Sequence, residues 1–348
     1  MNLIANLALP PLSAMYSVLT RARLALYRRG TFHTQKLTSP VISIGNLTTG
    51  GTGKTPLVEY VCRALANADR NICVLTRGYG RLQPKTRVLV SDGTNVLADP
   101  WQAGDEPFLL AQNLKGLAAV ISDADRVAAG QWAGRTLATD TFVLDDGFQH
   151  FRLRRDLDIV AIDALDPWGG NHLLPYGRLR EPISGLARAD CVVITRAEQG
   201  RAVTRLKGNL EDLTRRRPVF LSQMQTSGIK TLVDRKEVSR KSVPQPLAAF
   251  CAVGNPDSFF KQLEREGLVC VLKKIFPDHH VYRQADVDSL VDAAATAGAK
   301  GLITTAKDAV KLAAYFFQLP CHILEIQITF EEPREFLQMI LDSVSKGR

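Results

Sequence analysis

Short apolar runs alternate with helix-type patterns along the first two hundred residues. The runs at 41–44, 72–76, 88–90, 118–121, 142–144, 159–162 and 191–194 are mostly rich in β-branched residues and apolar throughout. This pattern is typical of parallel strands that are buried on both faces. Helical patterns such as those at 56–66 and 107–114 lie between the runs. We therefore predict a doubly wound, mostly parallel α/β sheet, which binds its ligands at the carboxyl ends of the strands.

The character of the chain changes after residue 196. Residues 201–218 are basic, and 219–243 read as two strands around Ser227-Gly228, followed by a polar linker. A second α/β pattern then begins at 247, with strands at 248–253, 269–272 and 302–304, helices from 254 and at 285–297, and a last helix after Pro333. This pattern predicts a second, smaller α/β domain of about a hundred residues.

The N-terminal segment is apolar but interrupted. Asn6, Pro10 and Pro11 break residues 1–19, and the positive charges follow the apolar stretch, which makes a poor signal peptide. From Pro11 onward we predict a helix with an apolar face formed by Leu12, Met15, Tyr16, Leu19 and Leu26. Arg21 and Arg28 lie opposite this face, while Arg23 falls on it. Such a helix can lie in a membrane interface or pack on its own domain, and the pattern leaves both open.

Composition and charge narrow the class of protein. The 348 residues can hold two domains, and 45% hydrophobic with 23% charged residues is ordinary for a soluble globular protein. The formal net charge of +9 favours anionic partners. Six scattered cysteines without a CxxC pair indicate reduced thiols rather than a disulfide framework or a zinc site. No stretch approaches the ~20 apolar residues of a membrane span.

The clearest chemical signal is a glycine-rich loop between a strand and a helix. Residues 41–58 read VISIGNLTTGGTGKTPLV, so an apolar strand leads into a phosphate-binding P-loop and the loop into a helix. Lys54 would reach the outer phosphates, and the Thr55 hydroxyl would ligate Mg²⁺. The usual first glycine is replaced by Thr48. The phosphate-binding residues that we predict are Thr48, Gly50, Gly51, Thr52, Gly53, Lys54 and Thr55.

Carboxylates follow two further patterns. TFVLDDGFQH (141–150) places Asp145 and Asp146 at the end of an apolar strand, where a P-loop enzyme positions an acid near Mg²⁺. Adjacent residues on a strand point to opposite sides, so one of the two is expected to face the metal directly. In AGDEPFLL (103–110), Asp105 or Glu106 is either a helix N-cap or an acid that accepts a proton from a substrate hydroxyl.

Three weaker signals remain open at this point. The Asp-His-His of FPDHHVY (276–282) suits a metal site, a general base with its partner, or a surface turn. VVITRAE (192–198) ends a strand where P-loop proteins often read the base, but it lacks the N-K-x-D guanine reader. Several arginines in loops after predicted strands could meet an anionic substrate; they are Arg77, Arg126, Arg152, Arg154, Arg155, Arg178 and Arg180.

Taken together, these motifs resemble the tetraacyldisaccharide 4′-kinases, the lipid A 4′-kinases of Gram-negative bacteria. The resemblance rests on IGNLTTGGTGKTP, TRGYGR, GDEP, DADR, LDDGFQH, GRLREP, ITRAE, FPDHH and TAKDAVK, in family order from residue 27 to 311. The family likewise lacks a glycine at the position of Thr48. Ala306 departs from the pattern, because the family usually carries an acid there.

The resemblance implies ATP-dependent phosphorylation of the 4′-hydroxyl of a tetraacyl glucosamine disaccharide 1-phosphate. It implies four segments: an N-terminal membrane-contacting helix (1–30), a P-loop kinase domain (31–218), a two-stranded linker (219–243) and a smaller α/β domain (244–348). ATP and Mg²⁺ are the implied cofactors, and the implied location is peripheral, at the cytoplasmic face of the inner membrane. The resemblance also shifts the balance for the N-terminal helix towards the membrane interface.

The resemblance further implies roles for single residues. Asp105 is similar to the family's general base, paired with His279, and Lys54 with Thr55 holds phosphates and metal. Asp145 and Asp146 support the metal. Active-site or substrate-binding positions are implied for Tyr79, Glu106, Arg126, Arg180 and Glu181.

Two alternatives come from other classes of protein. A P-loop ATPase switch or metallochaperone would release phosphate to water, with GDEP and the Asp-His-His segment as structural elements. A nucleic-acid-binding protein would use the +9 charge, but the chain lacks an aromatic-basic stacking motif and a recognition-helix pattern. We therefore expect no nucleic-acid partner.

Overall fold

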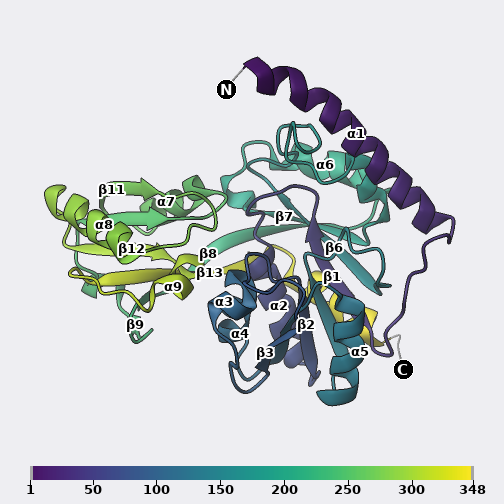
Figure 1. The fold of residues 1–348 in the computed structure, drawn as a ribbon, viewed down its shortest axis with the longest axis horizontal. Coiled ribbons are helices and arrows are strands. Elements are labelled where there is room, and N and C mark those ends of the chain that lie inside the picture. The colour runs from purple at the N-terminus through teal and green to yellow at the C-terminus, as the bar shows by residue number, and fades with distance from the viewer. Residues whose placement is uncertain (1–2, 346–348) are drawn as a thin grey trace.

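The computed structural model describes residues 3–345, which fold around one 13-stranded sheet (Figure 1). Its strands are β1 (Val41–Asn46), β2 (Ile72–Thr76), β3 (Val88–Asp92), β4 (Ala118–Ser122), β5 (Thr141–Asp145), β6 (Leu157–Asp163), β7 (Cys191–Thr195), β8 (Val219–Thr231), β9 (Glu237–Val238), β10 (Leu247–Cys251), β11 (Cys270–Ile275), β12 (Gly301–Thr305) and β13 (Cys321–Phe330). The spatial order is β11-β10-β12-β13-β8-β7-β6-β1-β5-β2-β4-β3, and β9 pairs with β8.

The helices flank this sheet on both faces. They are α1 (Leu3–Arg28), α2 (Lys54–Ala66), α3 (Pro100–Ala103), α4 (Asp105–Asn113), α5 (Arg126–Thr136), α6 (Val203–Leu213), α7 (Pro256–Arg265), α8 (Gln284–Thr296), α9 (Ala306–Leu312) and α10 (Pro333–Ser345). Short 3₁₀ helices are η1 (Ile183–Arg188), η2 (Ala197–Gln199) and η3 (Arg240–Ser242). The mixed α/β class with a mostly parallel sheet, predicted from the sequence, is confirmed.

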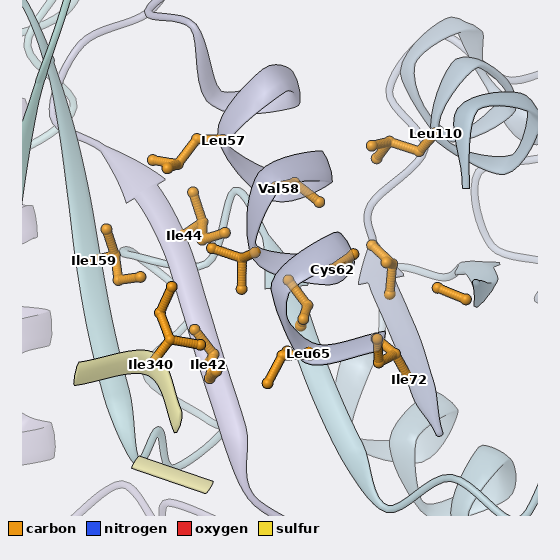
Figure 2. Packing of buried hydrophobic residues seen from close by; sticks show 14 of the residues in the cluster. Ile42, Ile44, Leu57, Val58, Cys62, Leu65, Ile72, Leu110, Ile159 and Ile340 are labelled. Carbon is orange, nitrogen blue, oxygen red and sulfur yellow. The ribbon is translucent and has the colours of Figure 1, made fainter. Parts of the chain in front are cut away.

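The strands from β7 to β4 are parallel to their neighbours and almost wholly buried. Each of the seven apolar runs that predicted strands before residue 200 lies in one of them or in β3. β3 is the exception to the parallel pattern, because it lies at the sheet edge and pairs antiparallel with β4. One face of β1 presents Ile42 and Ile44 to Leu57 and Val58 of α2 (Figure 2).

The last helix, α10, belongs to the core around β1 and α2. Phe336 and Ile340 are fully buried there, and Ile340 lies beside Ile42 in Figure 2. The sequence interpretation had assigned the whole segment 244–348 to a smaller domain, and that assignment is wrong for α10. The physical reason is that one face of α10 is strongly apolar and must be buried. β13 brings the chain back towards the first half of the sheet, where this face packs against α2 and β1.

β8 and β13 run antiparallel between the two halves of the sheet. The predicted break at Ser227-Gly228 is wrong, because β8 is one continuous strand from Val219 to Thr231. Ser227 and Gly228 lie within β8, at the point where its pairing with β13 shifts register between Glu325 and Ile326. The chain reverses only after Thr231, into the short strand β9. The two strands that link the halves are therefore β8 and β13, which are distant in sequence.

We call residues 31–218 with α10 the first lobe, and residues 244–320 the second lobe. The second lobe contains parallel strands β10, β11 and β12 between α7 on one face and α8 with α9 on the other. The predicted strands and helices of this region are present, with shifts of one to three residues at their ends. All six cysteines are free, as predicted.

α1 lies along the outside of the first lobe (Figure 1). It starts at Leu3 rather than near Pro11, so both prolines are inside the helix. Residues 1–2 of the predicted segment 1–30, and residues 346–348 at the other end, lie outside the described residues. Ser13 Oγ donates to Leu173 O at 2.8 Å and Tyr16 OH to Arg180 O at 2.9 Å, which fix one side of α1 to the body. Most of the predicted apolar face is exposed, at Leu12, Met15 and Leu19 and at the neighbouring Val18.

Candidate active site

The P-loop connects β1 to α2 with the backbone that its glycines allow. Gly50 and Gly53 have φ angles of 109° and 78°, which favour glycine. Gly53 caps α2 without a side-chain hydrogen bond, so the first N–H groups of the helix remain available to an anion. Thr48 needs no such freedom, because it forms an antiparallel bridge with Leu179. The amide of Asn46 donates to Thr48 O and Thr52 Oγ1, each at 2.8 Å, and so holds the loop from inside.

The end of β7 supports the same loop. Thr195 Oγ1 donates to Thr52 O at 2.9 Å. Arg196 donates to Gly51 O at 2.7 Å and to the carboxylate of Asp163 at 2.6 Å. The VVITRAE motif therefore contacts the backbone of the P-loop. The sequence analysis did not identify Asn46, Asp163 and Arg196 as residues that support the P-loop. The one sequence feature that they share is a position at the carboxyl end of an apolar strand.

Asp145 and Asp146 follow β5 and reach the P-loop in different ways. Asp145 is buried and accepts a hydrogen bond from Thr76 Oγ1 at 2.9 Å. Burial, reinforced by the nearby Glu106 and Asp146 carboxylates, raises the pKa of Asp145 to about 6.

Asp146 has a left-handed backbone, with φ of 52°. This conformation turns its carboxylate towards Lys54 Nζ at 3.5 Å and Arg180 Nη1 at 2.6 Å. Burial opposes ionisation, but Lys54 and Arg180 outweigh it and hold the pKa of Asp146 well below its usual range. The pKa values of the two neighbouring acids are thus shifted in opposite directions, because only Asp146 is paired with cations.

Asp105 and His279 meet although 174 residues separate them in sequence. His279 Nδ1 lies 3.3 Å from Asp105 Oδ2, and the Tyr79 ring packs on the imidazole at a centroid distance of 5.3 Å. His279, like Asp146, is a non-glycine residue with positive φ, here 60°. Such backbone is disfavoured and tends to persist where surrounding contacts at a functional site require it.

The alternative that Asp105 or Glu106 caps a helix is wrong. α4 begins at Asp105, its N-cap is Gly104, and no side chain caps it. Both carboxylates instead face cations of α9 in the second lobe. Glu106 Oε1 lies 3.1 Å from Lys307 Nζ, and Asp105 Oδ2 lies 3.2 Å from Lys311 Nζ. Burial opposes ionisation of Asp105, but His279 and Lys311 outweigh it and lower its pKa.

The two histidines of the Asp-His-His segment have separate environments. His280 stacks on Phe276 and lies 3.2 Å from Asp286 of α8, whereas His279 faces Asp105. Asp278 lies 3.5 Å from Lys307. In the described part of the chain no group of three or more His, Cys, Asp and Glu side chains is arranged to hold a metal ion.

Three predicted substrate residues have structural partners. Arg126 is buried and its guanidinium approaches Asp146 O at 3.5 Å. Arg180 is held by Asp146, as described above. Glu181 is buried, accepts from Arg188 at 2.6 and 2.7 Å, and accepts from Gln149 at 2.6 Å. Its carboxylate is thus engaged within the protein.

A cavity of about 1100 Å³ brings these groups together. Its walls come from the P-loop, from α1, from both lobes and from β13 between them. The lining includes Tyr16, Leu19, Arg23, Gly50, Gly51, Lys54, Thr55, Tyr79, Glu106, Arg126, Asp145, Asp146, Arg180, Glu181, Asn255, His279, Lys307 and Glu325. Asp105 does not line the cavity itself but contacts His279, which does. The apolar face of α1 borders this cavity through Leu19.

Known proteins of one family match this sequence over almost its whole length. A model of the family described as tetraacyldisaccharide-1-P 4′-kinase (LpxK) matches residues 5–345. The tetraacyldisaccharide 4′-kinase of Geobacter sulfurreducens is 41% identical over 98% of this chain and 93% of its own, and that of Geobacter metallireducens is 40% identical over 93% and 94%. The crystal structure of "apo" form LpxK from Aquifex aeolicus in complex with ATP superposes with a TM-score of 0.75 at 30% identity, over 96% and 98% of the two chains.

Proposed function

This chain belongs to the tetraacyldisaccharide-1-P 4′-kinase family, and we propose that its cavity transfers a phosphoryl group from ATP to the 4′-hydroxyl of a tetraacyl glucosamine disaccharide 1-phosphate. The protein is a phosphotransferase with an alcohol group as acceptor, in lipid A biosynthesis. The observation that supports the residue roles best is the contact between Asp105 and His279 beside the P-loop. A P-loop alone also suits hydrolases, but a hydroxyl acceptor requires a group that takes its proton.

The phosphates of ATP are assigned to the P-loop. Its glycines bring backbone N–H groups towards the cavity, and the uncapped start of α2 adds a positive dipole end. Lys54 lies in the same cavity, where its ammonium would stabilise the charge on the outer phosphates. Arg196 donates a hydrogen bond to Gly51 O and so holds the P-loop backbone in this conformation.

A magnesium ion fits the acids next to this loop. Asp145 is a buried acid with a raised pKa, and Asp146 Oδ1 makes no hydrogen bond among the described residues, although Lys54 Nζ lies 3.5 Å from it. A cation would relieve both features. Asp145, Asp146 and the Thr55 hydroxyl would hold Mg²⁺, which supplies charge neutralisation at the phosphate oxygens when it is bound.

The acceptor hydroxyl is assigned to Asp105 and His279. In transfer, the 4′-oxygen bonds to the γ-phosphorus, the bond from that phosphorus to ADP breaks, and the hydroxyl proton goes to the Asp105 carboxylate. His279 orients that carboxylate and stabilises its charge. Tyr79 and Glu106, which line the cavity, are assigned to the acceptor. Arg126 and Arg180 hold the acids in place, and Glu181 fixes Gln149 beside them.

The proposed domains bring the residues of the active site together. We infer a membrane-contacting helix in 1–30 and a P-loop kinase domain in 31–218 that is completed by α10. The linker of 219–243 is extended by β13, and the smaller domain lies within 244–320. Asp105 comes from the kinase domain and His279 from the smaller one, so the pair forms only when the domains lie together.

We infer that the acceptor arrives from a membrane surface. No helix in residues 3–345 is long and apolar enough to cross a membrane. The exposed apolar side chains of α1 border the cavity, so a lipid held by its acyl chains at this helix would present its sugar to the P-loop. Because ATP is a cytoplasmic nucleotide, the proposed location is the cytoplasmic face of the inner membrane.

The test is transfer of labelled γ-phosphate from ATP to purified disaccharide 1-phosphate lipid in detergent micelles. Wild type should form phosphorylated lipid, and Asp105→Ala should form it roughly 10²–10⁴-fold more slowly, because it lacks the proton acceptor. Asp212→Ala, an exposed acid on α6, is the matched control. Lipid-independent ATP hydrolysis by wild type, unchanged in Asp105→Ala, would favour the ATPase switch instead.

A further inference from the structure

Lys311 is a buried cation that the assignments above do not use. Only 3% of its side chain is exposed, yet its ammonium lies 3.2 Å from Asp105 Oδ2. The contact with Asp105 is an ion pair, and Nζ makes no hydrogen bond to any described residue. A buried ammonium with one counterion is expensive to maintain and contributes little to stability. Its placement therefore suggests a role in the chemistry of Asp105.

The surroundings hold Lys311 rigidly. Its ammonium lies 5.7 Å from the centre of the Tyr282 ring, a cation–π contact. The Tyr282 hydroxyl donates to Asp308 at 3.0 Å, and Asp308 also accepts from Thr305 Oγ1 at 2.7 Å and from Ala252 N. Asp308 is fully buried. This hydrogen-bonded support fixes the ammonium relative to the second lobe.

Two side-chain nitrogens approach the same oxygen of Asp105. His279 Nδ1 and Lys311 Nζ both approach Oδ2, at 3.3 and 3.2 Å. No donor among the described residues contacts Oδ1. The other charged groups nearby are Glu106 on α4, Asp278 beside His279, and Lys307 on α9, and Lys307 lies nearest to Glu106. Tyr79 faces the imidazole and not the carboxylate.

We propose that Lys311 is a positioning residue for phosphoryl transfer: together with His279 it holds Oδ2 of Asp105 and leaves Oδ1 to accept the proton of the acceptor hydroxyl. The proposal rests on the proposed function of Asp105 as the base. Because the ammonium favours the carboxylate form, Lys311 also keeps the base ionised at lower pH than Asp105 would reach alone.

The experiment compares Lys311→Met with Lys311→Arg, and uses the exposed Lys300→Met as a matched control. The rate of lipid phosphorylation at saturating substrates is measured from pH 4 to 8, with KM for ATP at each pH. Thermal unfolding checks that each variant is folded. Lys311→Gln replaces the methionine variant if that protein unfolds.

In Lys311→Met we expect kcat to fall about tenfold at neutral pH, with KM for ATP unchanged, because the carboxylate is less well placed. The acid limb of kcat should move up by about 1 pH unit, because the pKa of Asp105 rises when its cation is removed. Lys311→Arg should keep the limb near that of wild type.

Each other result has a defined meaning. A folded Lys311→Met with reduced activity and an unshifted acid limb would give Lys311 a purely structural role and overturn the proposal. If wild type itself phosphorylates no lipid, the proposed function fails, whereas an active wild type with an unshifted variant refutes only the role of Lys311.

Discussion

Asp145 carries a charge that its surroundings disfavour. Its pKa of about 6 in the folded protein exceeds the value of roughly 3.9 in an unfolded chain. The protonated form thus contributes stability below pH 4, and this contribution is lost as pH rises through 6. Asp145→Asn should therefore raise the free energy of unfolding at pH 8 by about 1–3 kcal/mol, with a smaller gain at pH 5, and abolish kinase activity.

Urea unfolding at the two pH values, in EDTA and without nucleotide, tests this expectation. Asp212→Asn, which removes an exposed acid, is the control and should change neither curve. An equal or lower stability of Asp145→Asn at pH 8 would contradict the physical account of this acid.

Arg196 is the residue whose loss should loosen the P-loop. It joins Gly51 O to the buried carboxylate of Asp163. Arg196→Met should weaken ATP binding about tenfold or more, because the loop loses a charged hydrogen bond. It should also destabilise the protein by roughly 3 kcal/mol, because Asp163 is left buried without its partner.

Calorimetric titration with ATP and urea unfolding measure the two effects. Arg205→Met on α6 removes an exposed arginine as the control. Arg196→Met with Asp163→Asn should recover much of the stability but not the affinity for ATP. Recovery of both would mean that Arg196 serves only to neutralise Asp163.

At the scale of elements, α1 offers a test of the membrane proposal. Met15 and Val18 are 57% and 66% exposed and do not line the cavity. Met15→Ser with Val18→Ser should reduce binding to phospholipid vesicles by about 100-fold, because two apolar side chains no longer enter the lipid. Thermal stability and activity in micelles should stay the same.

Co-sedimentation with vesicles measures this binding. Val233→Ser with Phe316→Ser is a matched control, because it removes two exposed apolar side chains that lie outside α1, 89% and 73% exposed. Vesicle binding that falls equally in both double variants would show that α1 is not the contact.

The sequence predicts elements well where the physical signal is local. Val41–Asn46 and Cys191–Thr195 were recognisable because a strand buried on both faces is apolar at most of its positions. Ser227-Gly228 misled the prediction, since a locally weak strand signal was overridden by pairing with β13 almost a hundred residues later. β13 itself was not predicted.

At the scale of the whole molecule, the second lobe presses directly on the P-loop. A Cβ on Gly254 would lie 2.8 Å from Gly51 N and 3.3 Å from Gly50 Cα, which are backbone atoms. Gly254→Ala should therefore separate the lobes locally, reduce kcat and raise KM for ATP by about tenfold, with little change in thermal stability.

Steady-state kinetics and thermal unfolding test this prediction. Gly208→Ala is the control, because a Cβ there meets no atom within 4 Å. Normal kinetics in Gly254→Ala would mean that the lobes do not need this close approach.

The assembly of the candidate site lies beyond local sequence signals. Residues such as Lys54 and Asp146 were predicted because each ends a recognisable strand or loop. The partnership of Asp105 with His279 came from family resemblance, and that of Asp105 with Lys311 was not foreseen. Such pairs depend on how β13 and α9 return to the first lobe, which tertiary packing decides.

The position of α10 has a consequence for how the protein is made. Phe336 and Ile340 complete the core against β1 and α2, and β13 occupies the middle of the sheet. During synthesis, Ile42 therefore lacks this cover until α10 has emerged from the ribosome. A nascent chain stopped before residue 333 would expose this surface to chaperones or aggregation, so the core beneath the P-loop is completed only after α10 has been made.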